Sequence, residues 1–175
     1  MGSEWNDKIF SAAPGNLEEL ALELFRFQYG SNPLYREFAD LTGKSPGRVR
    51  SLVEIPFLPI RFFKSHKVAT GDFAPAAFFE SSGTTGTLTS RHFIKDMDLY
   101  RRSFTEGFRR FYGNPAEWCI VGLLPAYLER AHSSLVVMVE ELIRLSGNQQ
   151  SGFYLYEREQ LHRLLRGLEA KGQKT

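Results

Sequence analysis

The sequence predicts a mixed α/β protein that begins with a helical part. Three observations support this. Apolar residues recur at helical spacing in the first third of the chain, and from residue 76 onward short apolar runs alternate with amphipathic segments. A polar segment rich in Ser, Thr and Gly lies between the first two of these runs. Alternating strands and helices are typical of a layered α/β architecture with parallel strand pairing.

The helical part is expected over residues 16–64. Asn16 is a candidate N-cap with Glu19 as its capping-box partner, because a carboxylate three residues after the cap can bond back to it. The apolar residues from Leu17 to Phe27 then share one helical face. Gly30 is the expected end of this helix, since glycine readily ends helices.

A second helix is expected to begin at Asn32-Pro33 and to stop at Gly43. Ser45-Pro46 is expected to open another short helix. The segment Ile55–Lys64 contains two prolines, which exclude a long regular element up to Pro59. Its apolar residues predict a connection that packs against the body of the protein.

The α/β part is expected over residues 76–171. Short apolar runs predict four strands, at Ala76–Phe79, Arg91–Ile94, Trp118–Leu124 and Phe153–Tyr156. Three helices are expected to alternate with them: one capped by Asp96 and closed near Gly113, one capped by Ser133 or Ser134 and closed at Gly147, and one from Glu157 onward. The first two strands would form a hairpin around the Ser/Thr/Gly segment, which would be exposed and mobile without a ligand.

The last predicted helix ends near Lys171, where an α/β chain normally continues into another strand. Only two or three strands follow the predicted hairpin, which is few for a parallel sheet covered on both faces. We therefore expect residues 1–175 to be a single α/β domain that forms the N-terminal part of a longer protein.

Composition excludes several classes of protein. With 42% apolar and 24% charged residues a globular chain is expected, and the net charge of +2 is too small to indicate a nucleic-acid partner. No apolar run is long enough to span a membrane, and the N-terminus lacks a signal-peptide pattern, so we expect a cytoplasmic protein. The lone Cys119 is expected to be a buried structural thiol.

The Ser/Thr/Gly segment is the strongest candidate for a binding site. Nine of the ten residues from Ser81 to Ser90 are Ser, Thr or Gly, the exception being Leu88. Glycines let the backbone approach an anion, and successive N–H groups can form an anion-binding nest. The expected phosphate-binding residues are Ser81, Ser82, Gly83, Thr84, Thr85, Gly86 and Thr89.

This segment is not a Walker loop. That motif requires Lys directly after its final Gly and a helix straight after it, whereas Gly86 is followed by Thr87 and then by a predicted strand. Without a helix dipole the grip on phosphate should be weaker. A surface hairpin without function is the alternative that composition alone would favour.

The order Ser81-Ser82-Gly83-Thr84-Thr85-Gly86 resembles the phosphate-binding signature of the adenylate-forming superfamily of acyl-CoA synthetases, aryl-CoA ligases and their relatives. Most members continue with Pro and Lys, where this chain has Leu88 and Thr89; Arg91 is a candidate substitute for the Lys charge. The doubled serine looks most like the acyl-protein synthetase branch of the bacterial luminescence fatty-acid reductase system. Aryl-CoA ligases of the phenylacetate type are the second candidate.

Two further segments resemble that branch. One is the Pro-rich stretch Ile55–Lys64, and the other is Leu124–Arg130 followed by Ser133-Ser134-Leu135. The second resembles a segment that lines the acyl or adenylate pocket in relatives. The resemblance therefore implies substrate-binding roles for Glu129, Arg130 and His132, against the alternative of a surface or capping role for each.

The resemblance implies a ligase that uses ATP and Mg²⁺ to convert a carboxylic acid, such as a long-chain fatty acid, into an acyl-adenylate. The acyl group would then pass to a thiol of CoA or of an acyl-carrying protein partner. No catalytic residue is assigned, because the family's catalytic Lys lies further along such chains. A non-catalytic domain that binds a phosphorylated ligand or a protein partner is the competing hypothesis.

Overall fold

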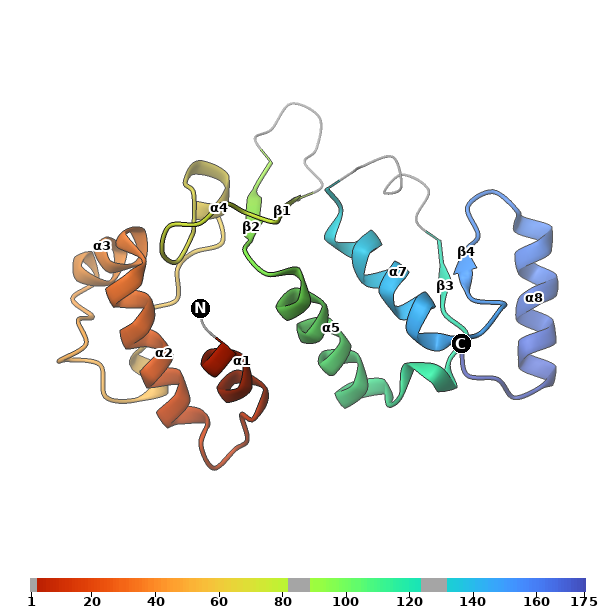
Figure 1. The fold of residues 1–175 in the computed structure, drawn as a ribbon, viewed down its shortest axis with the longest axis horizontal. Coiled ribbons are helices and arrows are strands. Elements are labelled where there is room, and N and C mark those ends of the chain that lie inside the picture. The colour runs from red at the N-terminus through yellow and green to blue at the C-terminus, as the bar shows by residue number, and fades with distance from the viewer. Residues whose placement is uncertain (1–2, 82–88, 124–131) are drawn as a thin grey trace. The chain divides into compact units, whose positions relative to one another are not determined.

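The computed structural model describes residues 3–81, 89–123 and 132–175, and shows a mixed α/β protein (Figure 1). The chain divides into two compact units. The N-terminal unit consists of residues 1–75 and 82–95, and the C-terminal unit of residues 76–81 and 96–175. The single domain expected from the sequence, and its proposed continuation, stay predictions.

The N-terminal unit is mainly helical. Its elements are α1 (Ser3–Phe10), α2 (Leu17–Ser31), α3 (Pro33–Leu41), the 3-10 turn η1 (Leu52–Glu54), α4 (Phe62–Ser65) and strand β2 (Arg91–Ile94). The buried side chains of Phe25, Tyr35 and Val49 form its core, one from α2, one from α3 and one from the following connection. The helical start predicted from apolar spacing is therefore confirmed.

Asn32 forms the junction between α2 and α3. Its backbone N–H donates to Gln28 O at 2.8 Å, and its side-chain oxygen accepts a hydrogen bond from the Tyr35 N–H at 3.1 Å. The predicted end of α2 at Gly30 is wrong, because Gly30 lies inside that helix. The predicted capping role of Asn16 is also wrong for its side chain, which accepts from the Ala13 N–H outside the helix.

We expect Asn32→Ala to lower the free energy of unfolding by about 1–2 kcal/mol, because the side chain is 5% exposed and caps α3. Asn16→Ala is the matched control: Asn16 is exposed and its side chain bonds no amide of α2, so loss of that side chain should cost only about 0.5 kcal/mol. Denaturant unfolding of both variants measures the difference. Equal losses would show that Asn32 does not act as the helix cap.

Two other predictions in this unit need correction. The segment that begins at Ser45 forms a single turn, closed by hydrogen bonds from Arg48 and Val49 to the Ser45 carbonyl, and not a helix. In the Pro-rich connection, Ile55 and Leu58 pack against the core as predicted. Phe57 and Ile60, however, are 76% and 80% exposed, because the prolines prevent a regular element that would turn one whole face inward.

The C-terminal unit alternates strands and helices as predicted. Its elements are β1 (Ala77–Glu80), α5 (Met97–Tyr112), the 3-10 turn η2 (Pro115–Glu117), β3 (Val121–Gly122), α7 (Ser134–Ser146), β4 (Gly152–Phe153) and α8 (Arg158–Ala170). Asp96 caps α5 by accepting from the N–H groups of Asp98 and Leu99, and Ser133 caps α7. Gly113 and Gly147 end these helices at φ +84° and +60°, which glycine adopts without strain.

Strands β3 and β4 pair in parallel, with Val121 opposite Gly152 and Gly122 opposite Phe153, which confirms the predicted parallel pairing. Lys174 forms a parallel bridge with Trp118, and its carbonyl accepts from the Cys119 N–H at 2.8 Å. The chain that leads into β3 therefore pairs with the residues after α8, while β3 itself pairs with β4.

Both strands are shorter than predicted. Of the predicted run Trp118–Leu124, the structure describes residues 118–123, and within them strand β3 covers only Val121 and Gly122. The predicted strand Phe153–Tyr156 is replaced by β4 at Gly152–Phe153. The length of each strand is set by the hydrogen bonds that pair it with the other strand. Leu123 is 55% exposed and lies outside the register that joins β3 to β4, so β3 ends before it. Apolar content alone did not reveal where the partner strand ends.

Strands β1 and β2 confirm the two short strands expected on either side of the Ser/Thr/Gly segment, with β1 shifted by one residue. Their antiparallel orientation, and the exposure of the segment itself, stay predictions, since residues 82–88 lie outside the described part of the chain. Across the described ranges, none of the helices has the length and apolar character needed to cross a membrane.

Candidate functional site

The candidate site begins at the end of β1, where the chain enters the Ser/Thr/Gly segment. Successive side chains of a strand point to opposite faces, and both faces of β1 carry an aromatic contact. Phe78 stacks on the His132 imidazole with ring centroids 3.9 Å apart and an interplanar angle of 26°. Phe79, which is buried, packs against Tyr100 of α5 with centroids 4.9 Å apart. The strand is thus held from both sides.

A main-chain hydrogen bond adds a third contact. The Glu80 N–H donates to the His132 carbonyl at 3.0 Å. His132 itself is placed by the start of α7, because the next residue, Ser133, is 7% exposed and its hydroxyl accepts from the Val136 N–H at 3.4 Å. The helix start therefore determines where the His132 ring and carbonyl lie.

These contacts bring together two segments that the sequence predicts to be functional. Ser81 directly follows Glu80, and His132 lies 54 positions after Phe78 in the chain. Ser81 is exposed, whereas the His132 ring is half-buried against Phe78. Ser82, Gly83, Thr84, Thr85 and Gly86, with Glu129 and Arg130, lie outside the described residues.

Two predicted phosphate-binding residues, Thr89 and Arg91, belong to the N-terminal unit. Arg91 is exposed at the start of β2, and Thr89 is half-buried just before it. The neighbouring His92 packs edge-on against Phe63, with ring centroids 5.9 Å apart and an interplanar angle of 89°. His92 is exposed at its strand position, and partial removal of water from its imidazole lowers the pKa of His92.

Cys119 is fully buried, as predicted, between the sheet and α8, where Leu164 and Leu168 pack against it. Burial raises the pKa of its thiol, and a hydrogen bond with Ser151 only partly opposes this. The Ser151 hydroxyl also accepts from the Ile120 N–H at 2.8 Å. A thiol kept protonated and away from solvent is a poor nucleophile, which fits a structural role.

Phe78 is the residue that sequence reasoning missed. It belongs to a short apolar run that reads as an ordinary strand, and no local signal links it to His132. The contact of Tyr100 with Phe79, next to the candidate site, was not predicted from the sequence either. The contacts of Phe78 with His132 and of Phe79 with Tyr100 become visible only once α5 and α7 are packed together within the C-terminal unit.

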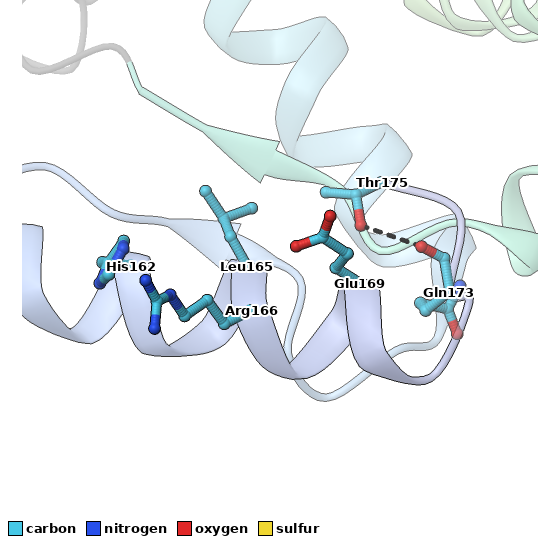
Figure 2. A pocket seen from close by; sticks show the side chains of 6 residues that line it. All are labelled: His162, Leu165, Arg166, Glu169, Gln173 and Thr175. Carbon is cyan, nitrogen blue, oxygen red and sulfur yellow. Dashed lines mark hydrogen bonds between the residues drawn. The ribbon is translucent and has the colours of Figure 1, made fainter.

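An open hollow lies on the exposed side of α8, lined by His162, Leu165, Arg166, Glu169, Gln173 and Thr175 (Figure 2). None of the predicted site residues lines it. Its side chains mix both charges with one leucine and do not converge on a common point, so it carries no catalytic arrangement. Among the described side chains, no group of three or more His, Cys, Asp and Glu residues could hold a metal ion.

Comparison with known proteins yields no relative of this chain. No family model, no curated protein and no solved structure matches it.

Proposed function

We propose that this chain contributes the triphosphate-binding segment of an enzyme that activates a carboxylic acid with ATP. The order Ser81-Ser82-Gly83-Thr84-Thr85-Gly86, which resembles the adenylate-forming signature, supports the proposal from the sequence. The single structural observation behind it is the placement of His132 against the strand that enters this segment. The start of the Ser/Thr/Gly segment and the segment that contains His132 were both assigned to one binding site. They lie close together, although 51 positions separate Ser81 from His132.

The proposed reaction has two steps. A carboxylate oxygen attacks the α-phosphorus of ATP, pyrophosphate leaves, and an acyl-adenylate forms. A thiolate then attacks the acyl carbonyl, and AMP leaves with the electrons of the broken C–O bond. The role of the Ser/Thr/Gly segment is to hold the triphosphate in line for the first attack.

Mg²⁺ would accompany the ATP, because this ion is commonly bound through substrate phosphates with few protein ligands. Its chemistry would be to offset charge on the departing pyrophosphate. Ser81, Thr89 and Arg91 are the described residues proposed to contact phosphate, the last through its charge. Glu129, Arg130 and His132 are proposed to lie in the part of the same site that holds the acyl group. The protein is proposed to work in the cytoplasm.

The acyl acceptor distinguishes the two ligase candidates. An acyl-protein synthetase would take a long-chain fatty acid and pass it to a protein thiol, whereas an aryl-CoA ligase would take an aromatic acid and pass it to CoA. Both share the first step. The non-catalytic alternative would bind a phosphorylated ligand and perform neither step.

Acid-dependent exchange of labelled pyrophosphate into ATP tests the proposal on the natural protein that contains this chain. We expect exchange with Mg²⁺ and a fatty acid, and none when the acid is omitted. Exchange with aromatic acids alone would favour the aryl-CoA ligase. ATP binding without exchange under any acid would favour the non-catalytic domain and contradict the proposed function.

A further inference from the structure

We infer that His132 is a positioning residue that fixes the end of β1, and through it the point at which the phosphate-binding segment begins. The inference rests on the proposed function for its consequence in catalysis. It assigns His132 a role as a flat ring and a carbonyl acceptor, in place of the direct substrate contact that the resemblance implies.

The ring geometry supports this role. The Phe78 and His132 centroids are 3.9 Å apart, which is close for a pair of nearly parallel rings. One face of the imidazole is therefore covered by Phe78. In this role the His132 ring contributes a flat surface that packs against Phe78. A phenyl ring can supply the same packing surface without a titratable nitrogen.

The main chain supports the same role. The Glu80 amide is the last of β1, and its hydrogen bond to the His132 carbonyl at 3.0 Å holds the residue directly before Ser81. Because the next residue, Ser133, caps α7, the carbonyl lies directly before the start of a 13-residue helix. The helix start and the strand end thus form one connected unit.

The opposite face of β1 makes the arrangement specific. Phe79 packs on Tyr100 of α5, so removal of the His132 ring would leave the strand with the aromatic contact on that face but without the one on the Phe78 face. We expect β1 to remain attached but to lose its exact position at Glu80 and Ser81. Displacement of this backbone would distort its hydrogen bonds to phosphate, which weaken steeply as their geometry departs from the preferred range.

The test compares three variants of the natural protein. His132→Ala removes the ring, His132→Phe keeps a flat ring without nitrogens, and His162→Ala alters an exposed histidine on α8 that lies outside the proposed site. Amide hydrogen exchange at Glu80, followed by NMR, reports the position of the strand without any need for ATP. We expect about tenfold faster exchange in His132→Ala, as for the loss of one aromatic pair, and wild-type exchange in the other two.

Pyrophosphate exchange supplies the second readout. We expect His132→Ala to raise the KM for ATP about tenfold with kcat within about twofold, because it weakens phosphate binding in ground and transition states alike. His132→Phe should restore the wild-type KM. Unchanged amide exchange in His132→Ala, or equal defects in His132→Ala and His132→Phe, would overturn the positioning role. Absence of pyrophosphate exchange in the wild-type protein would instead contradict the proposed function, while amide exchange would still decide the role of His132.

Discussion

Replacing Gly83 and Gly86 together by Val is expected to lower acid-dependent pyrophosphate exchange by about a hundredfold, with little change in the free energy of unfolding. Both positions lie outside the described residues, so the expectation rests on the sequence. Glycine lets the backbone approach a phosphate and adopt dihedrals that Val resists. Each lost charge-assisted contact is worth about 1–3 kcal/mol, and two at the lower half of this range give the hundredfold effect.

The control for this pair is Gly15→Val with Gly47→Val. No atom beyond the chain neighbours lies within 4 Å of a Cβ built at either position, and neither has a positive φ. This control should therefore exchange pyrophosphate at the wild-type rate. Full exchange in the Gly83/Gly86 variant would refute the phosphate-cradle hypothesis. A large loss of stability in that variant would show that the two glycines support the fold instead.

Replacing Gly122 by Ala is expected to lower the free energy of unfolding by about 1–3 kcal/mol, a large share of the total stability of a small protein. A Cβ at Gly122 would lie 2.6 Å from Phe153 Cδ1 and 3.1 Å from Val139 Cγ1. Phe153 is the residue paired with Gly122 in the β3–β4 register, and Val139 lies on α7. The ring covers the glycine because only hydrogen leaves room for it, so the methyl group forces the strand and helix apart.

Gly152 provides the matched control on the neighbouring strand. A Cβ there would meet only Tyr154, at 3.9 Å, which is ordinary contact. Urea unfolding should therefore show a small loss for Gly152→Ala and a large one for Gly122→Ala. Phe153→Leu, combined with Gly122→Ala, should recover part of the loss because it removes the ring from the clash. Equal stability of the two single variants would contradict the close packing at Gly122.

The helix boundaries could be predicted where the signal is local. Asp96 and Ser133 bond to amides two or three residues away, and Gly113 and Gly147 end helices through their own φ angles. Gly30 misled the prediction because Asn32, two residues later, caps the next helix and lets α2 continue to Ser31. A glycine thus ends a helix only when the chain beyond it also leaves the helical path.

The strands were harder to predict, because their hydrogen bonds join residues far apart in the chain. Trp118 and Cys119 pair with Lys174, and Val121 pairs with Gly152. An apolar run indicates that a strand is compatible with the sequence, but its length depends on where the partner begins and ends. For the same reason the contact of Phe78 with His132 was not predicted.

The sequence by itself determined the helical start, the alternation of strands and helices after residue 76, the caps of α5 and α7, and the chemical character of the Ser/Thr/Gly segment. Spacing, capping and composition are local properties, which is why they can be predicted in this way. The tertiary structure alone decided which residues meet: it buried Cys119 under α8, divided the chain into two units and placed the His132 ring on β1. Such contacts depend on the packing of α5, α7 and α8 around short strands, and close packing is a property of the assembled interior that no single segment encodes.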